Sequence, residues 1–114
     1  MSKKVEPQKD GTVVTRYKKL VSQHFITKRN VSDYASMIAV TPNHLSKLVK
    51  EQTGKTASSF IEEMLLMEAK ALLRHTELSI SEIAYQLDFT DPSHFNKFFK
   101  KGAETTPLQY RNLK

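Results

Sequence analysis

Residues 84–100 read AYQLDFTDPSHFNKFFK, and residues 35–50 read ASMIAVTPNHLSKLVK. The two stretches share an alanine, a threonine, a Pro-x-His triplet and two lysines, and apolar residues match between them. The second copy is longer by one residue, Asp91. A stretch that is repeated once within 114 residues is not a solenoid period. It indicates one small helix-turn-helix unit that the chain uses twice.

Length and composition are those of one globular domain with a basic balance. A chain of 114 residues can bury a modest core, and its net charge of +6 favours a polyanionic partner without identifying one. The absence of cysteine excludes disulfides and thiolate sites, and it agrees with the cytoplasmic location that we expect. No apolar run approaches the ~18 residues of a membrane span, so we expect no membrane partner.

Hydrophobic spacing predicts an all-α fold of about seven helices. We predict a flexible tail or linker remnant at 1–12 and one folded domain at 13–114. Within that domain we place a first helix-turn-helix at about 31–54, a connecting helix at about 57–75 and a second helix-turn-helix at about 79–102. Met64 and Met67 are expected in the core stripe of the connecting helix.

Helix starts are well signalled. Thr-Pro pairs at 41–42 and 106–107 combine a cap oxygen with a proline suited to the first helical position. The pattern Ser79-x-x-Glu82 is a capping box. We expect the second helix to be capped by Asn30 or Ser32, and the sixth by Thr90 or Asp91.

The outward residues of the third and sixth helices suit contact with DNA bases. Asn pairs with adenine and Lys donates to guanine, while Ser is versatile. The candidate base-reading residues are Pro42, Asn43, Ser46 and Lys47 in the first unit, and Asp91, Ser93, Asn96 and Lys97 in the second.

Other residues suit contact with phosphates. Lysines one turn beyond the readers can hold the backbone, and serines at helix starts lie beside free N–H groups that favour anions. The candidates are Ser32, Lys50, Ser79, Ser81 and Lys100. A connecting helix of ~18 residues spans roughly 27 Å, against about 34 Å between adjacent major grooves on one face of a duplex. We therefore expect the two reading helices to enter adjacent grooves.

Two segments carry a family resemblance. Residues 81–101 read SEIAYQLDFTDPSHFNKFFKK, and residues 106–111 read TPLQYR. They resemble the DNA-binding domain of the AraC/XylS family of bacterial transcription regulators, whose pattern is I-A-x-x-x-G-F, then S-x-F-x-R-x-F-K-K, then T-P-x-x-Y-R. The resemblance extends over about residues 14–111. It implies sequence-specific binding of operator or promoter DNA, with no enzymatic activity and no cofactor.

The resemblance also implies parts outside this chain. Family members usually carry a second domain that senses a small molecule or dimerises. We therefore expect this chain to be the C-terminal part of a larger effector-responsive regulator, with RNA polymerase as a further candidate partner.

Three departures from the family pattern have physical consequences. Asp88 stands where the family has a turn glycine, and Asp tolerates a left-handed backbone better than most residues. Glu104 stands where glycine ends the sixth helix, so we expect a loose or differently shaped end there. Lys47 and Lys97 replace frequent arginines, so bidentate guanine recognition is weaker than usual for the family.

Other functions fit the residues less well. His44 and His94 occupy equivalent positions, but neither has a second ligand at metal-binding spacing on its face, so we expect packing or phosphate-facing roles and no metal. No nucleophile is placed beside an oriented base. The alternative to DNA reading is a helical interaction module that docks on RNA polymerase or another regulator and binds DNA weakly.

Overall fold

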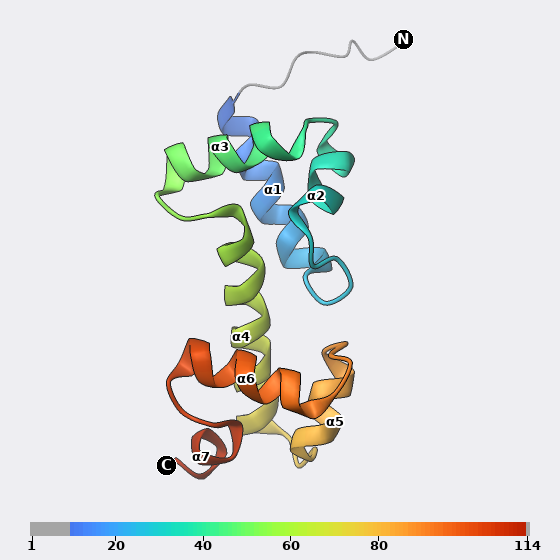
Figure 1. Ribbon diagram of the computed structural model, residues 1–114, viewed down its shortest axis with the longest axis vertical. Coiled ribbons are helices and arrows are strands. Elements are labelled where there is room, and N and C mark those ends of the chain that lie inside the picture. The colour runs from blue at the N-terminus through green and yellow to red at the C-terminus, as the bar shows by residue number, and fades with distance from the viewer. Residues whose placement is uncertain (1–9, 114) are drawn as a thin grey trace. The chain divides into compact units, whose positions relative to one another are not determined.

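The structure is a computed structural model that describes residues 10–113, and all of the regular structure in that range is helical (Figure 1). This confirms the predicted all-α fold. The helices are α1 (Asp10–His24), α2 (Val31–Ile38), α3 (Pro42–Thr53), α4 (Ala57–His75), α5 (Ile80–Gln86), α6 (Pro92–Ala103) and α7 (Pro107–Asn112).

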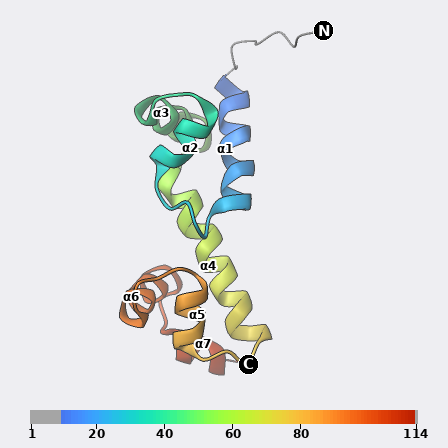
Figure 2. The same cartoon turned by 90° about the vertical axis from the view of Figure 1, so that its right-hand side faces the viewer.

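The chain divides into two compact units, and the boundary falls inside α4. The first unit, Met1–Ile61, contains α1, α2, α3 and the start of α4. The second, Glu62–Lys114, contains the rest of α4 with α5, α6 and α7. Each unit therefore holds one helix-turn-helix: α2 with α3, and α5 with α6. Figures 1 and 2 show α2 and α3 beside α1 in the first unit.

Two tyrosines organise the core of the first unit. Tyr17 and Tyr34 are fully buried and meet edge to face, with ring centroids 5.4 Å apart. The Tyr17 hydroxyl donates to the carbonyl oxygen of Ala57, the first residue of α4. Burial raises the pKa of Tyr17 above its usual range, so the hydroxyl stays a donor. This bond fixes the first turn of α4 against α1.

Aromatic rings fill the second unit. Phe95 and Phe99 are fully buried on α6, and Phe99 meets Tyr110 of α7 at 5.5 Å between centroids. The Tyr110 hydroxyl accepts from Nε of Arg74 at 2.9 Å. Arg111 donates from Nε to the carbonyl oxygen of Leu73 at 2.9 Å. The closing segment TPLQYR thus binds α7 to the last turns of α4, where helix carbonyls lack partners of their own.

The two helix-turn-helix joints have the same backbone geometry. Ala39, directly after α2, and Asp88, two residues after α5, are both left-handed, with φ of 69° and 66°. In each joint the next amide donates five residues back, from Val40 to Ala35 and from Phe89 to Ala84, at 3.0 Å in both cases. This is the six-to-one bond of a Schellman ending. Asp88 therefore adopts the left-handed backbone for which the family pattern has a glycine.

The second helices of the two units also have equal form. Both α3 and α6 have 12 residues and begin with proline. Both end in a left-handed residue that donates to a lysine carbonyl four residues back, Gly54 to Lys50 and Glu104 to Lys100. The expected loose or differently shaped end of the sixth helix is therefore wrong, because Glu104 adopts the backbone that glycine would.

Two other expectations, on the tail and on Met67, need correction. Residues 10–12 belong to α1 and not to a tail, because an acidic residue suits a helix start and the first turn tolerates glycine; residues 1–9 lie outside the described range. Of the two caps left open for α2, Asn30 holds the N-cap position, although its side chain makes no cap bond. Met67 is 60% exposed and so lies outside the core stripe, unlike half-buried Met64.

We expect Ala39→Gly to raise the free energy of unfolding by about 1 kcal/mol, because glycine removes the Cβ strain of a left-handed residue. Ala71→Gly on the exposed side of α4 is the control and should lower it by roughly 0.5–1 kcal/mol. Urea denaturation followed by circular dichroism measures both. A loss of stability in Ala39→Gly as large as in the control would contradict the left-handed joint.

Candidate nucleic-acid interface

Helix α3 separates a buried face from a polar one. Leu45, Leu48 and Val49 are at most 4% exposed and attach the helix to the first unit. The opposite face carries the candidate readers and phosphate contact, of which Pro42, Asn43, Lys47 and Lys50 are exposed and Ser46 is half-buried. The predicted outward placement is confirmed for the exposed four, whereas their contacts with DNA remain predictions.

Helix α6 repeats this division in the second unit. Phe95 and Phe99 face inward with no exposed surface. The candidates on the other face are open to solvent: Ser93, Asn96, Lys97 and Lys100 are exposed, and Asp91 is half-buried. Helices α3 and α6 therefore each carry an amide, a hydroxyl and two ammonium groups on the face opposite the core.

A surface hollow of about 500 Å³ borders the readers of the first unit. Ser46, Lys47 and Lys50 line it from α3. It reaches Thr56, which precedes α4, then Ala57 and Ser58 in the first turn of α4, and Val31 at the start of α2. Thr56 and Ser58 are not among the site residues that the sequence predicts. The sequence signal that could have found them is their position just after Gly54, where the chain turns back towards α3.

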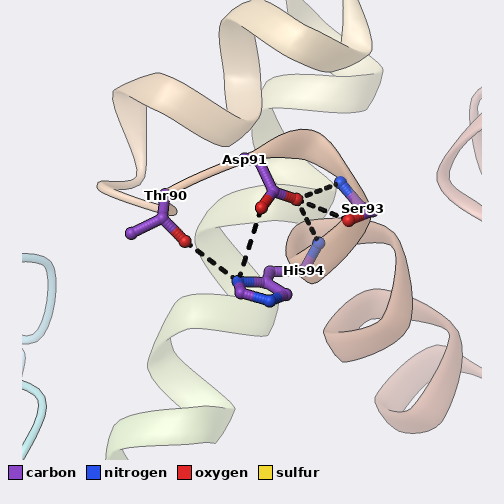
Figure 3. Close-up of polar contacts among 4 residues, drawn as sticks. All are labelled: Thr90, Asp91, Ser93 and His94. Carbon is purple, nitrogen blue, oxygen red and sulfur yellow. Dashed lines mark hydrogen bonds and ion pairs between the residues drawn. The ribbon is translucent and has the colours of Figure 1, made fainter.

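The capping arrangement differs between the reading helices because of the extra residue. Thr41 caps α3, where its Oγ1 accepts from the amide of His44 at 3.1 Å. In the second unit Asp91 caps α6 instead, and its Oδ1 accepts from the amides of Ser93 at 2.9 Å and His94 at 3.1 Å (Figure 3). Of the two caps left open by the sequence, Asp91 is the one used.

Asp91 and Ser93, both candidate readers, are bonded to each other. The Ser93 hydroxyl donates to Oδ1 of Asp91, and this bond together with the amide of His94 holds the pKa of the carboxyl below its usual value. The carboxylate is therefore charged at neutral pH and largely engaged in capping. Asn96 and Lys97 remain as the unengaged readers of α6.

The three serine candidates for phosphate binding all lie at the starts of helices. Ser79 caps α5 in a complete capping box. Oγ of Ser79 accepts from the amide of Glu82 at 3.0 Å, and Oε1 of Glu82 accepts from the amide of Ser79 at 2.7 Å. Ser32 and Ser81 are exposed at the second residues of α2 and α5. Lys50 donates to the carbonyl oxygen of Gly54 at 3.1 Å and would have to leave it to reach DNA.

Charge is distributed unevenly between the units. Met1–Ile61 contains eleven Lys and Arg against four Asp and Glu, a net charge of +7. Glu62–Lys114 contains seven against eight, a net charge of −1. Because attraction to a polyanion increases with positive net charge, the first unit is the more favourable of the two for a polyanionic partner.

Sequence reasoning also missed the part that Thr90 plays. Its Oγ1 lies 2.9 Å from Nδ1 of His94, one helical turn away (Figure 3). Within residues 10–113, no group of three histidine, aspartate or glutamate side chains is placed to hold a metal ion. No helix in that range has the length and apolarity needed to cross a membrane.

Known proteins share this arrangement. A helix-turn-helix domain family matches residues 34–113. The transcriptional activator RhaS of Escherichia coli is 32% identical over 91 residues, which are 80% of this chain and 33% of that protein. The chain thus spans about a third of the length of the curated relatives it matches.

Two solved structures are similar over most of their length. The C-terminal domain of AraT, a response regulator from Geobacillus stearothermophilus, has a TM-score of 0.84 and 28% identity over 90% of this chain and 85% of that one. A transcriptional regulator with an AraC-type DNA-binding domain from Chromobacterium violaceum has a TM-score of 0.78 and 25% identity over 87% and 88%.

The family match covers most of the chain, and the two solved structures share its fold. DNA binding, and not enzymatic catalysis, is the activity of this family. The chain belongs to the helix-turn-helix family of AraC-type DNA-binding domains of transcription regulators.

Proposed function

We propose that the chain regulates bacterial transcription by binding a specific double-stranded sequence through α3 and α6, each in its own major groove. The observation that carries this proposal is the accessible polar face that both helices present at equivalent positions. Asn43, Ser46 and Lys47 are the proposed readers in the first unit, and Asn96 and Lys97 in the second. Pro42, Asp91 and Ser93 shape or border these surfaces.

The two units would contribute unequally. The first unit, with its net charge of +7, would supply most of the salt-dependent affinity, and Lys50 with Ser32 would hold phosphates. The second unit, at −1, would add discrimination through direct contacts, with Lys100, Ser79 and Ser81 at phosphates. Since the outward residues differ between α3 and α6, the two half-sites should differ in sequence and form a direct arrangement.

A second candidate function applies to the second unit. Its net charge of −1 and its exposed apolar side chains, Tyr85, Leu108 and Leu113, suit a protein partner such as RNA polymerase. Because the aligned residues make up only 33% of the related regulator, response to a small-molecule effector would belong to a part outside this chain. A DNA-bound role would place the protein in the bacterial cytoplasm.

Selection from random duplexes separates the two functions. The chain is mixed with pooled random duplexes at moderate salt, and the retained DNA is sequenced. An enriched motif with two unlike halves supports the reading function. Retention without any motif would favour the interaction module.

Alanine replacements should separate readers from phosphate contacts. We expect Lys47→Ala to change the selected bases in one half-site and Lys97→Ala in the other. Lys50→Ala and Lys100→Ala should weaken all sequences alike and reduce the slope of log K against log salt by about 0.9 each. Fluorescence anisotropy titrations at several salt concentrations measure this. A uniform loss from all four replacements would eliminate the model of two readers.

Asp91→Asn should keep the cap, because asparagine is an equally good cap residue, and remove a negative charge beside the DNA. We expect tighter binding of all duplexes at neutral pH. The depressed pKa of Asp91 means that its carboxylate stabilises the fold above the unfolded pKa, near 3.9, and that this contribution is lost as pH falls through the folded pKa.

Acid denaturation therefore provides the matching control. Below pH 4 the variant should lose less stability than the wild type, since asparagine does not titrate. Thermal melts between pH 7 and pH 2.5 measure the difference. Identical pH profiles for the two proteins would show that the Asp91 cap does not form.

A further inference from the structure

We infer that His94 is a further DNA-contacting residue, which Thr90 positions so that the ring donates from Nε2 to a backbone phosphate. This inference rests on the proposed function. It concerns a side chain outside the reading set, and it follows from a difference between the two helix-turn-helix units.

The difference originates in the extra residue of the second unit. Equivalent residues are 49 apart up to Thr41 and Thr90, and 50 apart from Pro42 and Pro92 onward. The hydroxyl of Thr41 is occupied as the cap of α3. Because Asp91 has taken over the cap of α6, the hydroxyl of Thr90 is released from that role.

The Thr90 hydroxyl, which does not cap α6, forms a hydrogen bond with the His94 ring. Oγ1 of Thr90 lies 2.9 Å from Nδ1 of His94, and Oδ2 of Asp91 lies 3.9 Å from the same nitrogen (Figure 3). Yet the side chain remains 63% exposed. Within residues 10–113 the structure records no polar contact for the ring of His44, its counterpart in the first unit.

The hydrogen bond at Nδ1 leaves Nε2 of the His94 ring available as a donor on the exposed side chain. In the neutral ring, a hydrogen bond from the Thr90 hydroxyl to Nδ1 leaves the proton on Nε2. In the charged ring both nitrogens donate, and Nδ1 then donates to Thr90 with the Asp91 carboxylate nearby. Nε2 is therefore a donor in the charged ring and in the neutral ring whose Nδ1 accepts from Thr90. A ring that is already held loses less conformational freedom when it binds.

The position of His94 on α6 favours a phosphate over a base. Residues two apart on a helix point about 160° apart, since each residue turns the helix by 100°. His94 therefore faces away from Asn96, and it lies one turn before Lys97. His94 is only about 60° around the helix from Lys97, so it lies at the edge of the outward face, and when that face is turned to the bases a side chain at its edge meets the groove wall of sugar and phosphate.

Dissociation constants for the enriched duplex and for an unrelated duplex provide the test. We expect His94→Ala to weaken both by a similar factor, about fivefold. Thr90→Val, which keeps the shape and removes the hydroxyl, should cause about half of that loss on a logarithmic scale. His44→Ala should cause a clearly smaller loss than His94→Ala, and His75→Ala at the end of α4 should cause none.

Two readouts distinguish positioning from a structural effect. The double variant Thr90→Val/His94→Ala should bind no worse than His94→Ala alone, because Thr90 acts through His94. Ring ¹⁵N shifts of His94 should change in Thr90→Val, whereas those of His44 should not. Equal melting temperatures confirm that the variants are folded.

Several outcomes would overturn the inference. These are additive losses in the double variant, a loss in His94→Ala no greater than in His44→Ala, or a change in the selected motif in place of a uniform loss. The wild-type selection experiment separates this result from the broader proposal. A wild type that selects no motif refutes the reading function, whereas a wild type that selects one while His94→Ala binds equally well refutes only the role of His94.

Discussion

The left-handed joint between the two helices of each unit is the constraint on which the rest depends. A reading helix must bury one face against its unit and leave the other accessible, so the chain has to reverse within a few residues. Ala39 and Asp88 make that reversal with φ of 69° and 66°, and the amides that follow bond back to Ala35 and Ala84. These two alanines are fully buried, so no larger side chain separates the packed helices.

Sequence indicated much of this because the signals are local. Caps, prolines at first helical positions and hydrophobic spacing act within one turn of helix, and they predicted the helices and the outward faces of α3 and α6. The closing segment was identified by resemblance alone. Its role in holding α7 on α4 through Tyr110 and Arg111 depends on contacts more than 30 residues apart, which no local pattern encodes.

What the sequence could not predict depends on competition between neighbouring groups. Thr90 and Asp91 were both possible caps, and only their relative placement shows that the carboxylate wins and that Ser93 is drawn to it. The hollow beside Ser46 was also not predictable, because it depends on how the chain turns back between Gly54 and Ala57. The uneven charge was countable from the sequence, but it acquired meaning only when the boundary between the units was known.

The single extra residue of the second unit lies between two fixed points, the bond from Phe89 to Ala84 and the proline at the start of α6. Helix α6, which follows the extra residue, keeps the 12-residue length and the left-handed ending of α3. The segment between these points can therefore accept an added residue while the helices on either side keep their packing. A duplicated unit can in this way acquire new binding preferences while its scaffold stays under the same selection as the original.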